Sequence, residues 1–185
     1  PWARGVVLHH TWSPVPATWR GLRSMVGLRR YYRDDVRWVD AQGREQRGWE
    51  AGPHLFVVHG SPDPAQDGIW QLTALNETGV HAGAWNRTHW GVEVVGDYDH
   101  VPWPGPLREL VYGISLALLR WRGLPVDRST VRGHRECGST KSCPGWAIDL
   151  DRAAEFLKQF HPHPSMRLVA KGRRAGPDGA FAVLR

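Results

Sequence analysis

The sequence predicts an α/β fold in which a central β-sheet is flanked by helices in a single domain, and three observations predict it. Four short apolar runs, each bounded by turn residues, have the length and composition of buried strands. Stretches with a helical spacing of apolar residues lie between and after these runs. The length of 185 residues, with 41% hydrophobic and 23% charged residues, suits one well-buried core.

The four apolar runs are expected to form the strands of the sheet. They cover residues 5–11, 54–59, 69–72 and 90–96. Asp67 and Gly68 make a turn before the third run, so the second and third strands are expected to pair. Residues 34–53 are typical of a loop or hairpin, and residues 76–86 of a loop that carries His81.

Three helices are expected around these strands. The first begins at an N-cap on Thr18 and ends near residue 33. The second covers about residues 107–122, with Pro106 near its first position, and Asp149 caps the third, which ends near residue 160. Helical spacing gives the first helix an apolar stripe of Leu22, Met25, Val26 and Leu28, and the second a core face of Leu110, Ile114, Ala117, Leu118 and Trp121.

Residues 133–145 form a loop that is built to present side chains, with the sequence Gly-His-Arg-Glu-Cys-Gly-Ser-Thr-Lys-Ser-Cys-Pro-Gly. An imidazole and a thiolate from this loop can meet if the chain curls back at Gly138, and a zinc ion is the usual reason for such a meeting. A catalytic zinc normally takes three protein ligands, so one must come from elsewhere. The histidine pair His9 and His10 is the best candidate, because it ends a strand where an open α/β sheet places functional groups.

Composition narrows the class of protein. The net charge of +6 indicates attraction to a polyanion, which could be nucleic acid, an anionic membrane or a bacterial cell wall that carries teichoic acid. No apolar run is long enough for a membrane-spanning helix, and the first residues lack the pattern of a secretory signal. Cys137 and Cys143 are too few for a disulfide framework, so reduced thiols near a metal are expected.

The motifs of this chain resemble, in their order, those of a known family. They are a strand that ends in His-His-Thr, then Pro-His-Leu-Phe-Val, Val-His-Ala-Gly, Trp-Gly-Val-Glu-Val-Val-Gly, and Gly-His-Arg followed by Lys-Ser-Cys-Pro-Gly. The family is that of the zinc-dependent N-acetylmuramoyl-L-alanine amidases, in the superfamily of phage lysozymes and peptidoglycan recognition proteins. The resemblance covers about residues 5–160. It implies a mixed central sheet with zinc in a surface groove, so that residues 1–160 would be a zinc amidase domain and residues 161–185 an extension of unknown role.

The resemblance also implies a ligand set and a reaction. His9, His134 and Cys143 match the family's zinc ligands, with His10 as the alternative to His9. Cys143 is favoured over Cys137 as the third ligand because Pro-Gly follows it. The implied substrate bond is the amide between the lactyl group of N-acetylmuramic acid and the L-alanine of the stem peptide. Zinc polarises the carbonyl and lowers the pKa of a bound water towards about 7. Lys141 would stabilise the oxyanion, a contribution of about 10²–10³ in rate.

The general base and the substrate-binding residues are also expected from the resemblance. Glu93 matches a glutamate that some members use as the base, and its apolar flanks would raise its pKa; the alternative is a structural carboxylate paired with an arginine. Other members use a tyrosine just before the histidine of the second strand, but Pro53 stands there. Residues expected to bind substrate in the groove are His54, His81, Trp85 and Asn86.

Three other functions compete with this one. A peptidoglycan-binding recognition module would keep the fold without the chemistry, but such relatives generally lose the third ligand, and Cys143 and Lys141 are present. A nucleic-acid-binding protein with a structural zinc is suggested by charge alone, and the paired ligand spacing of such sites is missing. A zinc peptidase would cut a different amide.

The expected partner is therefore peptidoglycan, with no specific nucleic acid, and the expected state is a monomer. The missing signal pattern and wall-binding repeat favour a phage lysin over a bacterial recycling enzyme or a secreted defence protein.

Overall fold

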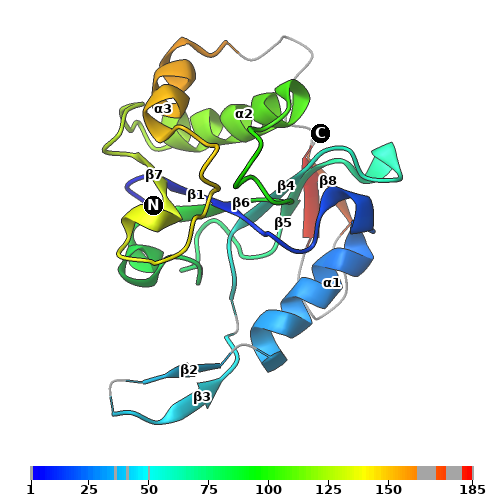
Figure 1. Cartoon of the computed structure of the whole chain (residues 1–185), viewed down its shortest axis with the longest axis vertical. Coiled ribbons are helices and arrows are strands. Elements are labelled where there is room, and N and C mark those ends of the chain that lie inside the picture. The colour runs from blue at the N-terminus through cyan, green and yellow to red at the C-terminus, as the bar shows by residue number, and fades with distance from the viewer. Residues whose placement is uncertain are drawn as a thin grey trace.

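The computed structural model describes residues 2–35, 37–40, 42–49, 51–161, 170–173 and 181–184, and a mixed β-sheet forms its centre (Figure 1). Across the sheet the strands follow the order β7-β1-β6-β4-β5-β9-β8. The strands from β7 to β4 are parallel to their neighbours, and β5, β9 and β8 pair antiparallel. The bounds are Val6–His10 (β1), Leu55–Val58 (β4), Gly68–Gln71 (β5), Trp90–Val94 (β6), Val131–Gly133 (β7), Ala170–Arg173 (β8) and Phe181–Leu184 (β9).

The sequence predicts most of this sheet correctly. The strands β1, β4, β5 and β6 lie within the four apolar runs, and β4 pairs antiparallel with β5 as expected. The strand β7 was not predicted, because three residues are too few to show the alternation of apolar and polar residues that indicates a strand. Residues 161–185 were expected to be an extension of unknown role, and their described parts include the paired strands β8 and β9.

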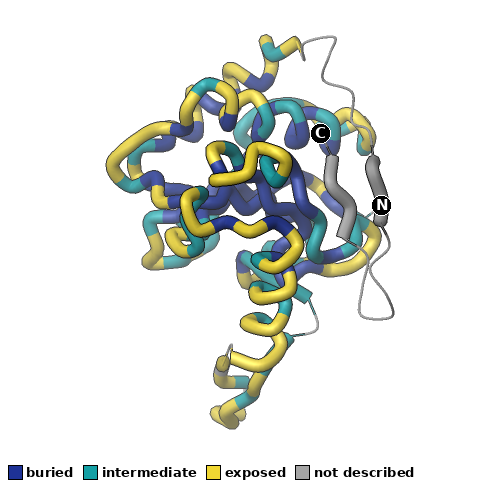
Figure 2. The backbone as a smooth tube through the Cα atoms, turned by 90° about the vertical axis from the view of Figure 1, so that its right-hand side faces the viewer, coloured by how far each residue is buried: buried dark blue, intermediate teal, exposed yellow. Residues whose placement is uncertain are grey.

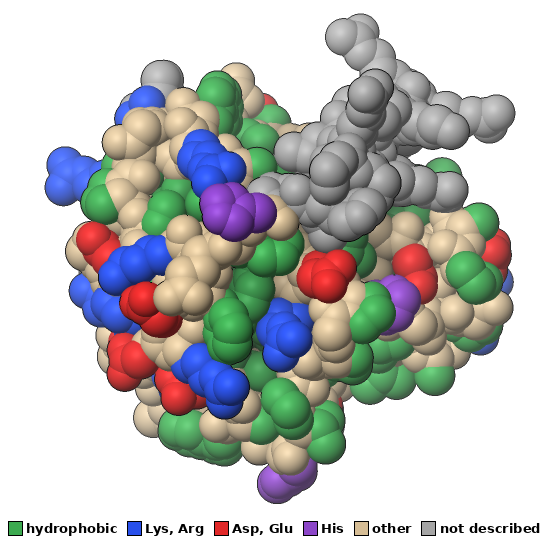
Figure 3. Space-filling model, turned by 90° about the horizontal axis from the view of Figure 1, so that it is seen from above, with side chains coloured by type: hydrophobic (Ala, Val, Ile, Leu, Met, Phe, Trp, Pro, Cys, Tyr) green, Lys and Arg blue, Asp and Glu red, His purple; other side chains and the backbone are tan. Residues whose placement is uncertain are grey.

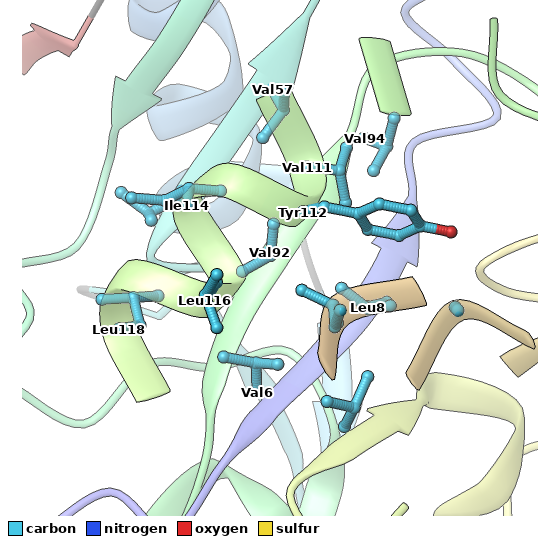
Figure 4. Close-up of a cluster of buried hydrophobic side chains, with 14 of the residues drawn as sticks. Val6, Leu8, Val57, Val92, Val94, Val111, Tyr112, Ile114, Leu116 and Leu118 are labelled. Atoms are coloured by element: carbon cyan, nitrogen blue, oxygen red, sulfur yellow. The ribbon is translucent and has the colours of Figure 1, made fainter. Parts of the chain in front are cut away.

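The two faces of the sheet carry two separate cores, because side chains alternate along each strand. One face is covered by α2 (Gly105–Trp121) and α3 (Leu150–Gln159), and Val6, Leu8 and Val92 pack there with both helices (Figure 4). On the other face Phe56 belongs to a smaller cluster, to which α1 (Leu22–Arg30) contributes Met25. Figure 2 shows the buried strands at the centre of the molecule.

The first helix begins later than predicted. Residues Pro16–Thr18 form a separate 3-10 turn, in which the Thr18 hydroxyl donates to the Val15 carbonyl, so Thr18 is not the N-cap. The cap is Gly21, and after α1 the chain continues as a π-helical turn over Tyr31–Asp35. Of the expected stripe only Met25 is buried. Leu22 and Val26 are exposed because α1 projects from the sheet instead of lying flat on it (Figure 1).

The core face of α2 is also broader than predicted and is turned towards α3. Of the expected face, Ile114 and Leu118 are buried, whereas Leu110 and Ala117 are half-buried and Trp121 is 63% exposed. The reason is that α2 is covered by the sheet on one side and by α3 on another. The residues buried by this double contact are Leu107, Val111, Tyr112, Ile114, Ser115, Leu116, Leu118 and Leu119. Asp149 caps α3 as predicted, by accepting from the Arg152 N–H at 2.9 Å.

The strands β2 (Arg37–Val39) and β3 (Glu45–Arg47) form the hairpin expected between the first two buried strands, and it projects from the body of the domain next to α1 (Figure 1). No helix among the described residues is long and apolar enough to span a membrane. On the face seen in Figure 3, lysine and arginine side chains lie among aspartate and glutamate side chains. The positive net charge is therefore not gathered into one patch on that face.

Candidate active site

The carboxyl ends of three neighbouring parallel strands build the site. His9 on β1 lies opposite Glu93 on β6 in the strand register, and His134 directly follows β7, which pairs with the other edge of β1. Since Leu8 and Val92 point towards α2, the next residues, His9 and Glu93, point to the face that carries α1. The pleat and the strand order thus bring together side chains from both ends of the chain.

A possible metal site lies at this point. One nitrogen each of His9 and His134 and the Sγ atom of Cys143 all lie within 4.8 Å of one another. The ring centroids of the two histidines are 4.7 Å apart. The His10 backbone N–H donates to the Cys143 sulfur at 3.1 Å, which favours a thiolate there. The structure therefore assembles one thiol and two imidazoles that are far apart in the sequence.

Arg135 stabilises the loop that contains Cys143. Its backbone N–H donates to the Cys143 carbonyl at 2.8 Å, and its guanidinium donates to the carbonyls of Gly145 and Ile148, each at 2.7 Å. The loop consequently curls back on His134, as the Gly- and Pro-rich sequence indicated. The role of Arg135 could not be read from the sequence, where it is one of many arginines.

Hydrogen bonds fix the tautomer of His9. His81 Nε2 lies 3.1 Å from the His89 carbonyl, which can only accept, so this nitrogen carries the proton. In a neutral ring His81 Nδ1 is then an acceptor, and it lies 3.0 Å from His9 Nε2. His9 Nε2 must therefore be protonated, which leaves the lone pair on Nδ1. A metal-binding histidine is typically oriented by such a bond on its other nitrogen.

Two small features keep His81 in place. The Asn86 side-chain oxygen accepts from the backbone N–H groups of His81 and Ala82, at 2.8 and 2.6 Å. A Cβ atom at Gly91 would lie 2.6 Å from the His81 ring, so any other residue there would push the ring away. His81 and Asn86 both line the groove, as expected, and their observed contacts serve to position His9.

Burial sets the protonation states of the possible ligands. Burial lowers the pKa of His9 well below its ordinary value, and it lowers the pKa of His134 to about 4 with a further contribution from Lys141. Both rings are therefore neutral at pH 7, which is the form that binds metal. Burial raises the pKa of the Cys143 thiol, which would have to release its proton to an incoming cation.

These donors fit zinc. Two neutral imidazoles and one thiolate are nitrogen and sulfur ligands of the type that zinc prefers, and three protein ligands leave a fourth position open. The site also opens onto a groove of about 1130 Å³, which gives a substrate access to that position. A closed structural site would offer neither feature.

Two ionisable groups accompany the donors in the groove. The Glu93 carboxyl is buried, with Oε2 4.0 Å from His9 Nδ1, and its pKa is raised to about 8 by burial, although Lys141 acts in the opposite direction. Lys141 lines the groove on an exposed part of the 133–145 loop. Within the described residues Glu93 makes no ion pair with an arginine, in contrast to the structural alternative.

Tyr32 is a groove residue that the sequence did not reveal. Its ring lies against Gly52, next to Pro53, and burial raises the pKa of its hydroxyl well above 10, with further contributions from the nearby Glu93 and Cys143. Tyr32 belongs to the π-helical turn after α1, so its place in the groove cannot be predicted from the spacing of residues in a strand motif.

Two of the residues expected in the groove, His54 and Trp85, do not line it. His54 does not face the groove: it is fully buried, its Nδ1 accepts from the Gly91 N–H, and its Nε2 lies 3.0 Å from the Glu77 carbonyl. Trp85 does not line the groove either, because its ring packs on His89 under the Arg132 guanidinium.

His10, the alternative first ligand, points away from His134 because adjacent side chains on a strand alternate. Its Nδ1 accepts from the Tyr98 N–H at 3.1 Å and lies 3.9 Å from Asp97.

Comparisons with known proteins agree with this fold. Among solved structures, a point mutant of Drosophila PGRP-LB in complex with tracheal cytotoxin is 22% identical, with a TM-score of 0.59 over 83% of this chain and 79% of its own. The Ph2119 endolysin from a Thermus scotoductus bacteriophage is 23% identical, with a TM-score of 0.57 over 84% of each chain. The N-acetylmuramoyl-L-alanine amidase LysC from Clostridium intestinale is 15% identical, with a TM-score of 0.53 over 85% of this chain and 86% of its own.

No curated protein matches the chain. The family model described as N-acetylmuramoyl-L-alanine amidase matches residues 1–146, which include every donor of the possible metal site. The chain therefore belongs to the N-acetylmuramoyl-L-alanine amidase family.

Proposed function

We propose that this chain is a zinc-dependent amidase that hydrolyses the bond between the lactyl group of N-acetylmuramic acid and the L-alanine of the peptidoglycan stem peptide. The observation that carries the proposal is the convergence of His9, His134 and Cys143 beside Glu93 in an open groove. Membership of the amidase family supplies the substrate class. The bacterial cell wall would accordingly be the partner of this protein.

His9, His134 and Cys143 would hold the ion. When bound, zinc supplies a Lewis acid that polarises the scissile carbonyl and makes water more acidic. The hydrogen bond from His9 to His81 would keep the His9 ring in its binding orientation.

Glu93 would act as the general base. It would take the proton of the attacking water and deliver it to the nitrogen of the departing L-alanine, so that a free carboxyl, a free amine and the original carboxylate result. Its raised pKa of about 8 suits this task, because a base is most effective when its pKa is near the working pH.

Lys141 would stabilise the charge that develops on the carbonyl oxygen. Beside the larger effect of burial, its ammonium already lowers the pKa of Glu93 and Cys143, so its field reaches the reacting groups. A positioned donor of this kind typically contributes about 10²–10³ in rate.

The test is digestion of purified peptidoglycan by the zinc-loaded protein, with and without a chelator. We expect new L-alanine amino termini, their loss with the chelator, and their return when zinc is restored. New amino termini on another amino acid would instead identify a peptidase. Binding to peptidoglycan without any cleavage would identify a recognition module, and either result would contradict the proposal.

A further inference from the structure

The hairpin of β2 and β3 projects from the domain next to α1, and none of its described residues lines the groove (Figure 1). Residues 20–47, which contain α1 and this hairpin, hold eight arginines but only four acidic residues. This segment therefore carries +4 of the chain's net charge of +6. Most of the excess positive charge belongs to the projecting part of the molecule.

Two arginines of the hairpin lie directly opposite each other. Arg37 on β2 is the register partner of Arg47 on β3, so both side chains leave the same face of the hairpin. Residues in such positions have Cβ atoms about 5 Å apart, and two like charges there destabilise a strand pair. We call Arg37 and Arg47 the arginine pair. The stability of the hairpin does not account for this choice of residues.

No carboxylate neutralises the arginine pair within the described part of the chain. Asp34 accepts from the Arg33 guanidinium at 2.7 Å. Asp40 accepts from the Arg44 guanidinium at 2.8 Å. Glu45 lies on the same face as the arginine pair but forms no ion pair with either member. Two exposed guanidiniums are thus held next to each other without a counterion from the protein.

The backbone that carries the arginine pair is fixed at both ends of the hairpin. At the turn, the Asp40 carboxylate accepts from the backbone N–H groups of Gln42 and Arg44, each at 2.9 Å. At the base, the Trp49 N–H donates to the Tyr32 carbonyl at 3.0 Å, which joins the hairpin to the π-helical turn. A binding partner would therefore meet a preorganised surface, which lowers the entropy cost of binding.

The chemistry of two neighbouring guanidiniums indicates a phosphate ligand. Each guanidinium is a planar fork of N–H donors that matches a pair of phosphate oxygens, and it is more weakly hydrated than an ammonium group. A phosphate diester has two unesterified oxygens on one phosphorus atom. One diester, or two neighbouring diesters of a polymer, can therefore bridge Arg37 and Arg47 and remove their mutual repulsion.

The surroundings of the arginine pair favour a flexible polymer among the partners that carry phosphate. Of the four register-paired residues on this face, Val39 alone is apolar, so a lipid surface would bury little apolar area there. A nucleic-acid duplex presents a dense array of phosphates and is bound through many contacts, whereas the three-residue strands offer one arginine pair beside Glu45. A polymer with well-separated phosphates needs only a contact of this size.

We propose that the arginine pair binds the phosphate diesters of an anionic cell-wall polymer of the teichoic acid type and so holds the protein at the wall. This inference rests on the proposed function for the place where the protein acts. It concerns a surface outside the groove and a ligand that is not cleaved, so it can be measured without amidase activity.

The experiment measures calorimetric binding of poly(glycerol phosphate), free of peptidoglycan, to the full-length zinc-loaded protein. Arg37→Gln and Arg47→Gln are each expected to weaken binding roughly tenfold, because each removes one charge-assisted contact. Arg120→Gln removes an exposed arginine at the end of α2 and should leave the affinity unchanged. Tm should not fall in either hairpin variant, because each relieves a repulsion.

Four results would contradict this inference. They are undetectable binding by the unmodified protein, an equal loss in Arg120→Gln, unchanged binding in both hairpin variants, and a fall in Tm that gives the arginine pair a structural task. Tighter binding to a DNA duplex or to phosphatidylglycerol vesicles, lost in the same variants, would overturn the assignment to a wall polymer. Polymer binding that depends on the arginine pair in a protein that cleaves no peptidoglycan would uphold the inference and reject only the proposed amidase activity.

Discussion

His9 and His81 share a hydrogen bond of 3.0 Å, and through it the backbone carbonyl of His89 determines which nitrogen of His9 is free. His9 on the first strand is thus oriented by the loop that carries His81, whose ring packs on Gly91. This relationship makes the geometry of the possible metal site depend on a residue that lies outside its donor set.

Replacing His81 should therefore weaken the metal site without unfolding the protein. His81→Phe keeps a ring over Gly91 but removes the acceptor for His9 Nε2, and we expect zinc affinity to fall about 10–100-fold. Competition with a chromophoric chelator measures this. His100→Phe alters an exposed histidine and should leave the affinity unchanged, and equal affinities for both variants would contradict the orienting role.

The two cysteines should differ sharply in metal binding. Cys143→Ser removes the thiolate from the donor set, so the purified variant should contain much less zinc than one ion per chain and should show no rise in Tm when zinc is added. Cys137→Ser should keep a full ion, because Cys137 lies outside that set. Elemental analysis after dialysis checks both, and zinc loss from the Cys137 variant alone would reverse the assignment.

Glu93→Gln should separate metal binding from catalysis. The amide fills the same space but cannot take a proton, so kcat for peptidoglycan cleavage should fall about 10²–10⁴-fold while zinc content stays constant. Glu109→Gln, on the exposed side of α2, is the control. If kcat were unchanged in the Glu93 variant, the carboxylate would have a purely structural task.

Lys141→Met should lower kcat about 10²–10³-fold, because it removes the positive charge next to the developing oxyanion. Lys141→Arg restores a charge with a different shape and should recover part of the rate. Kinetics on a soluble muramyl peptide measure the effect, with Lys158→Met on α3 as the matched loss of an exposed lysine. A decrease of equal size in the Lys158 variant would show that net charge, rather than position, is responsible.

His54 should make the metal-free protein sensitive to acid. Burial lowers its pKa from 6.5 to about 4, so the unfolded chain takes up a proton first as the pH falls. The stabilising contribution is complete above pH 6.5 and is lost between pH 6.5 and 4, by up to roughly 3 kcal/mol. His54→Gln should reduce the difference in urea stability between pH 7.5 and 4.5 by roughly 2–3 kcal/mol, whereas His100→Gln should not.

The parts of this fold that follow from local pattern were predictable. The strands β1, β4 and β6 are short apolar runs with clear ends, and the capping aspartate Asp149 lies where a helix begins. The meeting of His9 with His134 was expected from the motifs and not from the sheet, because the strand β7 that His134 follows was not predicted.

What could not be predicted depends on contacts between distant segments. His54 and His81 look alike in the sequence, but His54 is buried beneath the loop that contains His81. Only the packing around Gly91 distinguishes the two. Tyr32 reaches the groove because α1 continues into a π-helical turn, which has no sequence period of its own. The backbone conformation of Trp12 is likewise visible only in three dimensions.

The strand order β7-β1-β6 has a consequence for incomplete chains. A polypeptide that stops before β7 retains Glu93, the proposed base, and His9, a proposed ligand, but it lacks His134, Lys141 and Cys143. Nascent or proteolytically shortened forms would therefore be inert towards the cell wall, and hydrolytic capacity would arise only when the final third of the domain has docked against the first strand.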